Sequence, residues 1–168
     1  AGTTHCSGAG TMVLEISATP YIFTFKMWDW GRLDLDGKPR PIHLEHGMKN
    51  IQWDRNTEWV QQNLIHQETL VHQDETCKVE RTGLHEREFI DTFRVTTCKS
   101  APIPRNGSVH VLNLVDGKSA RLVSADGSFA PMQLHYAETC IVPQGAGDYR
   151  IESESGEEIK VILACVRG

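Results

Sequence analysis

Alternating hydrophobic and polar positions are the main pattern of the chain from residue 64 onward. Turns containing Asp-Gly, Asn-Gly or other glycine-rich sequences separate short runs at residues 89–96, 109–114, 119–123, 138–143 and 159–166. A period of two places one face of a strand against a core. Many short strands with frequent turns predict an antiparallel sandwich or barrel over residues 64–168.

Two dipeptides predict hairpins within this β-rich part. Asp116-Gly117 separates the runs 109–115 and 118–123, and Asp126-Gly127 follows the second run. Both dipeptides accept the positive φ angles of a type I′ turn. Together with further runs at 137–143 and 148–151, this order is typical of a double-stranded β-helix.

The first third of the chain follows other patterns. Residues 11–30 are rich in β-branched and aromatic side chains, with a break at Thr19-Pro20, and predict two strands. Two glycines and two prolines predict a loop at a domain edge over residues 31–41. Helical spacing over residues 42–51, with a second short run at 56–62, predicts a short helical connector.

Composition and charge exclude several classes of protein. The chain has 168 residues, 39% of them hydrophobic, which suits one large or two small globular domains. It contains no apolar run of about 18 residues and does not begin with a secretory signal. The formal charge is only −5, and the basic residues are scattered. We therefore expect a cytoplasmic protein with neither a membrane nor a nucleic-acid partner.

The cysteines agree with a reducing compartment. Their number is odd and none forms a CxxC pair, so they do not predict a disulfide framework. We expect reduced thiols, mostly buried in strands, at Cys6, Cys77, Cys98, Cys140 and Cys165.

A candidate metal ligand lies near the start of the chain. His5 is flanked by glycines in a short segment, and Glu15 ends the following run. An imidazole in a turn can present one nitrogen to a divalent metal while a neighbour orients the other. The chain has no initiator methionine, so we expect it to begin inside a domain.

The residues around this histidine resemble a known enzyme family. The sequence GTTHCSGAGTMVLEI, followed by KMWDWGRLDLDGKPRPIHLEH, is similar to a segment of class I mannose-6-phosphate isomerases. That segment has a Gly-Thr-x-His turn, a Glu-Ile strand, a basic residue, an aromatic-Asp-aromatic-Gly-Arg sequence and a Gly-Lys-Pro-Arg loop. The resemblance is specific over residues 1–50, and over residues 64–168 only the general cupin strand pattern matches.

The resemblance implies roles for four residues. His5 would bind the metal, with zinc the usual ion. Glu15 would carry a proton or position the sugar, Lys26 would supply a cation in the same pocket, and Arg32 would lie at the pocket mouth or hold a carboxylate such as Asp29. The family more often has arginine at the position of Lys26, and lysine keeps the charge but loses the bidentate fork.

The residue types suit the reaction that the resemblance implies. Interconversion of an aldose and a ketose moves a proton between adjacent carbons, which needs a carboxylate or imidazole. A metal or cation stabilises the developing oxyanion, and a phosphate needs lysine or arginine. A catalytic zinc takes about three protein ligands. We therefore expect the polypeptide alone to be inactive, and the other ligands to come from the missing N-terminal part of the same protein or from another chain.

Other histidine and tryptophan groups predict no site. His43 and His46 lack the HExxH spacing and indicate a solvated connector. A second group shows no HxH motif followed by a glutamate at the usual spacing, so we expect no metal in the β-rich part; this group contains His66, His72, His85, Glu86 and Glu88. Except for Trp30, the tryptophans are expected to pack a domain junction rather than a sugar.

We therefore expect an all-β protein with the cupin-type double-stranded β-helix, or jelly roll, and a short helical connector. Residues 1–33 would be closing strands of a truncated first cupin barrel, 34–63 the loop and connector, and 64–168 a C-terminal cupin-like jelly roll. The resemblance implies a zinc-dependent isomerase of mannose 6-phosphate and fructose 6-phosphate. The alternative is a non-catalytic sugar-binding or regulatory cupin; a cupin epimerase or dioxygenase would require an HxH motif, which is absent.

Overall fold

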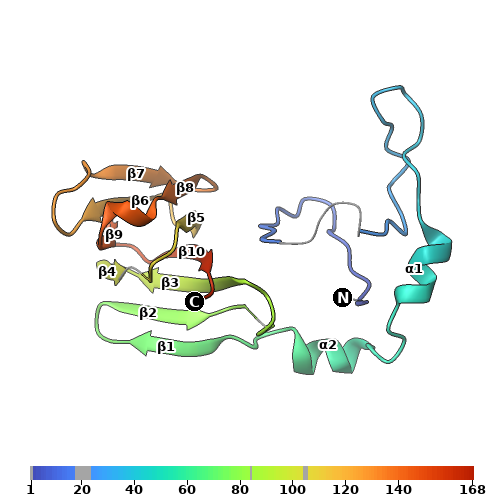
Figure 1. The fold of residues 1–168 in the computed structure, drawn as a ribbon, viewed down its shortest axis with the longest axis horizontal. Coiled ribbons are helices and arrows are strands. Elements are labelled where there is room, and N and C mark those ends of the chain that lie inside the picture. Colours follow the sequence, from blue (N-terminus) through green and yellow to red (C-terminus); the bar gives the residue numbers. More distant parts are fainter. Residues whose placement is uncertain (1, 18–23, 84, 104–105) are drawn as a thin grey trace. The chain divides into compact units, whose positions relative to one another are not determined.

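The computed structural model describes residues 2–17, 24–83, 85–103 and 106–168. The chain divides into two compact units, unit 1 (Ala1–Ile65) and unit 2 (His66–Gly168). Figure 1 shows the helices α1 and α2 in unit 1 and the strands β1 to β10 in unit 2.

Two short helices lie where the sequence predicts a helical connector. They are α1 (Leu44–Asn50) and α2 (Thr57–Asn63). The side chain of Asn56 caps α2 by accepting a hydrogen bond from the backbone N–H of Trp59 at 2.9 Å. Among the described residues, no helix is long and apolar enough to span a membrane.

The strands predicted within residues 11–30 are not observed. Residues 11–17 and 24–30 form no strand, and the Thr19-Pro20 break lies outside the described residues. Several apolar side chains of this part are exposed to solvent, among them Met12 at 65% and Val13 at 61%. A strand is stabilised by a paired neighbour and by a core under one face, and the described part of unit 1 supplies neither to these residues. The assignment of residues 1–33 to a first barrel stays a prediction.

A tight turn follows Arg32 in the region predicted to be a loop. The carboxylate of Asp34 accepts hydrogen bonds from the backbone N–H groups of Asp36 and Lys38, each at 2.9 Å. Leu33 and Pro39 form a β-bridge, and the N–H of Arg40 donates to the carbonyl of Arg32 at 3.0 Å. The turn therefore returns the chain so that Arg40 lies beside Arg32.

Unit 2 is built from two antiparallel sheets. The larger sheet has the strand order β1-β2-β3-β10-β5-β8, and the smaller has the order β4-β9-β6-β7. Figure 1 shows β1, β2 and β3 in one layer and β6, β7 and β9 in the other. The strands are β1 (Thr69–Gln73), β2 (Cys77–Arg81), β3 (Ile90–Thr97), β4 (Ser100–Ile103), β5 (His110–Asp116), β6 (Ser119–Ser124), β7 (Met132–His135), β8 (Thr139–Val142), β9 (Tyr149–Ser153) and β10 (Ile159–Val166).

The strand pairs are nested as in a jelly roll. β6 pairs with β7, β5 with β8, β4 with β9, and β3 with β10, all antiparallel. The chain from β3 to β10 is therefore one long hairpin that is rolled up, so that β3, β4 and β5 alternate between the two sheets. The hairpin β1–β2 extends the larger sheet beyond β3.

The core lies between the two sheets and belongs to unit 2. Alternation is clear on β10, where Ile159, Val161 and Leu163 are at most 5% exposed. The cluster of buried apolar residues takes members from both sheets, namely Cys77, Val95, Ala101, Ile103, Leu112, Leu114, Ala120, Leu122, Leu134, Cys140, Val142, Tyr149, Ile151, Ile159, Val161, Leu163 and Cys165. Burial of this surface is the main force that holds the sheets together.

One of the two predicted hairpin turns is wrong. The loop with Asp126-Gly127 joins the paired strands β6 and β7, but Asp116-Gly117 joins β5 to β6, which lie in different sheets. Gly117 has the expected positive φ of +94°. The positive φ of Gly117 was therefore predicted correctly, but the type I′ turn was not, because Asp116 is not among the residues with a positive φ. The partner of β6 was decided by packing, because β9 and β7 pair with its two edges.

Candidate functional site

His5 has the geometry of a histidine that can bind a metal. Its side chain is exposed, and Nδ1 lies 3.1 Å from the carbonyl oxygen of Thr3. Because a carbonyl oxygen only accepts hydrogen bonds, Nδ1 is the donor and Nε2 keeps its lone pair. This backbone contact on the second nitrogen is the arrangement usual for metal-ligating histidines.

Among the described residues, Glu15 forms no hydrogen bond or ion pair with the other predicted site residues. Its side chain is exposed. Within residues 2–17, 24–83, 85–103 and 106–168, no hydrogen bond or ion pair joins Glu15 to His5, Lys26 or Arg32. The described part of unit 1 therefore does not assemble the four predicted residues into one contact group.

Lys26 and Arg32 belong instead to a cationic cluster around one carboxylate. Asp29 is only 8% exposed, and Arg40 binds it through two hydrogen bonds of 2.6 Å, Nε to Oδ2 and Nη2 to Oδ1. The Nζ of Lys26 lies 3.8 Å from Oδ2. We call Lys26, Asp29, Arg32 and Arg40 the Asp29 cluster. Three cations against one carboxylate leave it with a net positive charge.

The charges of this cluster keep Asp29 ionised. The hydrogen bonds from Arg40 lower the pKa of Asp29 from its ordinary value of 3.8, burial opposes them, and the charges of Arg40, Lys26 and Arg32 lower the pKa further. From the sequence, Arg32 was expected either at the pocket mouth or as the partner of a carboxylate such as Asp29; its charge lowers the pKa of Asp29, but the hydrogen bonds to Asp29 come from Arg40. Arg40 holds Asp29, because the turn after Arg32 returns the chain. The Asp34 to Gly37 turn residues were the available signal.

His43 fixes the backbone of Lys26. The N–H of His43 donates to the carbonyl of Lys26 at 2.7 Å, and the N–H of Lys26 donates to Nδ1 of His43 at 3.2 Å. These two bonds tie Lys26 to the start of α1. The Nδ1 lone pair of His43 is therefore used within the protein.

The interior of unit 2 contains a polar chain that the sequence did not reveal. His110 and Tyr149 are each 2% exposed, and Nδ1 of His110 lies 2.9 Å from the hydroxyl of Tyr149. Nε2 of His110 lies 3.0 Å from Oδ1 of Asn106, whose Nδ2 donates to the sulfur of Cys165 at 3.1 Å. These bonds join β5, β9 and β10 across the core. A histidine within the apolar run 109–114 was the only signal in the sequence.

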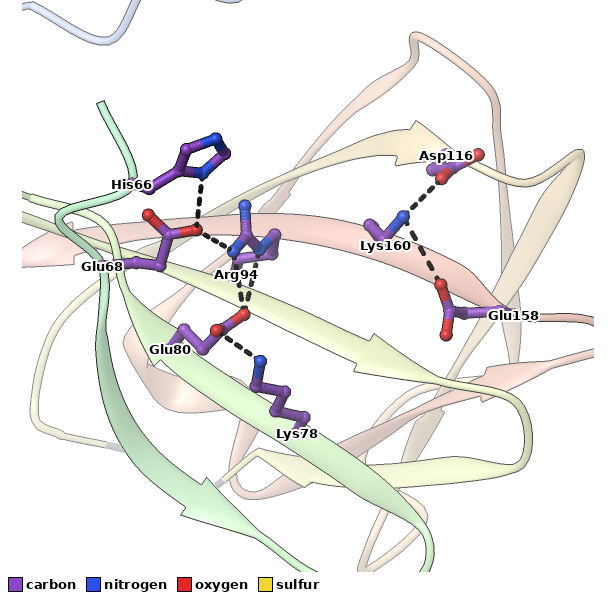
Figure 2. Close-up of polar contacts among 8 residues, drawn as sticks. All are labelled: His66, Glu68, Lys78, Glu80, Arg94, Asp116, Glu158 and Lys160. Carbon is purple, nitrogen blue, oxygen red and sulfur yellow. Dashed lines mark hydrogen bonds and ion pairs between the residues drawn. The ribbon is translucent and has the colours of Figure 1, made fainter. Parts of the chain in front are cut away.

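A second polar network lies on the larger sheet, where Figure 2 shows Arg94 between two carboxylates. Its Nη2 lies 2.7 Å from Glu68 and 2.9 Å from Glu80, and Nε lies 3.1 Å from Glu80. Lys78 binds the other oxygen of Glu80 at 2.6 Å. Since each charge has an opposite partner, this network ties β2 and β3 to the chain before β1.

The described residues bring together a set of three metal-type ligands, His72, Asp74 and Cys77, on the β1–β2 hairpin. Their ligand atoms all lie within 4.8 Å of one another. Such a His/Asp/Cys cluster can bind a metal ion. From the sequence, His72 was grouped with His66 and His85, whereas in the structure its neighbours are Asp74 and Cys77.

Comparison with known proteins identifies the fold. No protein-family model and no curated protein matches the sequence. The mannose 6-phosphate isomerase from Bacillus subtilis aligns with a TM-score of 0.60 and 15% identity over 83% of this chain and 39% of that chain. A vicilin from Corylus avellana (hazelnut) aligns with a TM-score of 0.50 and 10% identity over 61% and 32%. A cupin-2 domain from Rhodospirillum rubrum aligns with a TM-score of 0.49 and 8% identity over 60% and 70%.

The nested strand pairs, with the likeness to the Bacillus isomerase and vicilin structures, show an all-β jelly-roll fold of the cupin type with a short helical connector. The predicted fold class is confirmed. The chain spans 39% of the length of the Bacillus isomerase.

Proposed function

We propose that this chain is the C-terminal portion of a zinc-dependent aldose–ketose isomerase that interconverts mannose 6-phosphate and fructose 6-phosphate. The observation that carries the proposal is the Asp29 cluster, which collects Lys26, Arg32 and Arg40 around one carboxylate. A sugar phosphate needs such a surplus of positive charge, since its phosphate carries up to two negative charges at neutral pH.

The likeness to the Bacillus isomerase supports the same proposal. Unit 2 alone is smaller than the 83% of this chain that the alignment covers, so the alignment includes part of unit 1. The residues with proposed chemical roles lie in unit 1. The likeness by itself speaks for the fold, and the activity rests on the residues.

Each residue has a role that its chemistry allows. Glu15 would move the proton between the adjacent sugar carbons, because a solvated carboxylate can take up and return a proton. Lys26 and Arg32 would face the phosphate or the developing oxyanion. Arg40 would act as a positioning residue, because its two bonds to Asp29 hold the cluster together.

His5 is suited to bind zinc, but the described residues do not supply the remaining ligands of a catalytic zinc site. Nε2 of His5 is available, whereas a catalytic zinc takes about three protein ligands. The proposal therefore assigns the other ligands to the missing N-terminal part of the same protein or to another chain. When bound, zinc would act as a Lewis acid on the sugar oxygen.

A non-catalytic sugar-binding or regulatory cupin is the second candidate. It is favoured by Glu15, which is exposed and forms no hydrogen bond or ion pair with His5 or with the Asp29 cluster among the described residues. Such a protein would bind a sugar phosphate through the same cations but would not need a proton carrier or a metal.

The test is metal analysis of the full-length gene product together with an isomerase assay on mannose 6-phosphate. We expect His5→Ala to lower kcat/KM by roughly 100-fold or more and to reduce bound zinc. His135→Ala is the matched control, because this histidine is also exposed and its partner is a surface glutamate. Lys26→Met is expected to raise KM more than it lowers kcat.

The outcomes separate the two candidates. If activity survives in His5→Ala, the metal assignment is wrong. If the unmodified protein shows no isomerase activity but binds mannose 6-phosphate in a Lys26-dependent manner, the non-catalytic candidate replaces the enzyme. Absence of both binding and turnover would exclude mannose 6-phosphate as the ligand of this protein.

A further inference from the structure

The β1–β2 hairpin brings three different metal-type ligands to its turn. β1 ends at Gln73 and β2 begins at Cys77, and the N–H of Asp74 donates to the carbonyl of Cys77 at 3.0 Å. The sequence His72-x-Asp74-x-x-Cys77 therefore curls so that an imidazole, a carboxylate and a thiol come within 4.8 Å of one another. Short-range backbone geometry, rather than a distant contact, makes this group.

The turn itself orients the carboxylate. Oδ1 of Asp74 accepts three hydrogen bonds, from the N–H and hydroxyl of Thr76 at 2.7 Å each and from the N–H of Cys77 at 2.9 Å. Oδ2 is directed instead toward Nε2 of His72, 2.9 Å away. The turn thereby fixes the carboxylate so that its second oxygen faces the imidazole of His72.

The accessibility of the group allows an ion to enter. The side chains of His72 and Asp74 are 53% and 44% exposed, while Cys77 is 5% exposed and lies at the edge of the core. A cation would therefore bind from the solvent side and contact the sulfur at the bottom of the turn. The three ligand atoms already lie within 4.8 Å of one another, and the exposed imidazole can rotate about its side-chain torsions.

From this arrangement we propose that His72, Asp74 and Cys77 form a binding site for a zinc-type divalent cation. The mixture of nitrogen, sulfur and oxygen ligands suits Zn²⁺ or its substitute Co²⁺ rather than Mg²⁺ or Ca²⁺, which take oxygen ligands. Three protein ligands leave the fourth position to water. The three ligands belong to unit 2, whereas the zinc proposed at His5 uses a residue of unit 1, and each proposal has its own test.

The experiment is a titration of the whole chain, stripped of metals and kept reduced, with Co²⁺. We expect one high-affinity equivalent with the ultraviolet thiolate-to-cobalt absorption and the visible bands of a tetrahedral ion, and we expect Zn²⁺ to displace it. Cys77→Ser should remove the thiolate absorption. His72→Ala and Asp74→Asn should weaken binding by roughly 10-fold or more each.

Controls separate this site from the other ligands of the chain. Asp74→Asn keeps an acceptor for the turn and removes the charge, and His72→Ala changes an exposed side chain, so neither should unfold the protein. The matched thiol control is Cys6→Ser with Cys98→Ser, since both cysteines are free and exposed. This control and His5→Ala should leave the thiolate absorption unchanged.

Two outcomes would overturn the site. One is the absence of a thiolate absorption in the unmodified chain at saturating Co²⁺. The other is a thiolate absorption that survives in Cys77→Ser or disappears in the Cys6 and Cys98 control, which would assign the metal to an exposed thiol. Neither result would affect the isomerase assay, which reads the activity of the full-length protein.

Discussion

Gly117 shows how one residue shapes the path of the chain. It has a φ of +94° where the chain passes from β5 to β6, and a Cβ at this position would lie 2.6 Å from Cγ2 of Ile159. Ile159 is 1% exposed and belongs to the core, so it has little room to move. Glycine is therefore required for both backbone conformation and packing.

We predict that Gly117→Ala lowers the free energy of unfolding by roughly 2 to 5 kcal/mol, the sum of left-handed strain and overpacking. Gly127→Ala is the matched control, because Gly127 has a φ of +79° and no atom within 4 Å of the added Cβ. It should cost only about 1 to 2 kcal/mol. Urea denaturation measures both variants, and equal losses would show that the contact with Ile159 does not matter.

For single residues, the sequence predicted backbone conformation better than it predicted which distant side chains lie in contact. Asp116-Gly117 correctly indicated a positive φ, because that preference is local to the glycine. It did not reveal Ile159 as the neighbour of Gly117, since the two are 42 positions apart. For the same reason Asp29 was recognised as a carboxylate in need of a cation, while Arg40 was not recognised as the cation that binds it.

Among the elements, β2 and β3 are joined by charge as well as by backbone pairing. Arg94 on β3 binds Glu80 on β2, and the side chain of Glu80 is only 9% exposed. The hydrogen bond from Lys78 lowers the pKa of Glu80 from its ordinary value of 4.5, burial opposes it, and Arg94 lowers the pKa further. The folded state therefore binds this proton less well than the unfolded chain does.

We predict that Glu80→Gln lowers stability at pH 7 by about 1 to 3 kcal/mol and flattens the loss of stability in acid. The stability that Glu80 contributes is present above about pH 4.5 and is lost as the pH falls through its lower folded value. The control is Glu158→Gln, a 61% exposed partner of Lys160 in Figure 2. Urea midpoints from pH 7 to pH 3 test this, and parallel curves for both variants would contradict it.

Elements with strong local patterns were predicted, and elements without them were not. The runs at 89–96, 109–114 and 159–166 correspond to β3, β5 and β10, whose alternation is clear because one face is buried. β1 was not identified because all five of its residues are exposed. The prediction of strands over residues 11–30 was wrong because a β-forming composition does not make a strand by itself. These residues have no partner strand in the described part of unit 1.

At the scale of the whole molecule, the core and the nested strand pairs lie entirely within unit 2. We therefore predict that residues 66–168 fold without unit 1. Far-ultraviolet circular dichroism should show β-structure and a single cooperative thermal transition, with Tm within about 5 °C of the transition of the β-rich part in the whole chain. Loss of cooperativity in the shorter chain would show that unit 1 supplies part of the core.

The sequence by itself determined the all-β class, the helical connector and the residue types near His5 and Asp29. These depend on periodicity and turn chemistry, which are visible within a few neighbouring residues. Tertiary structure decided which strands pair, where the chain changes sheet, and that Arg40 rather than Arg32 holds Asp29. Those outcomes depend on side chains far apart in the sequence competing for the same buried space and the same charges, and no local pattern records that competition.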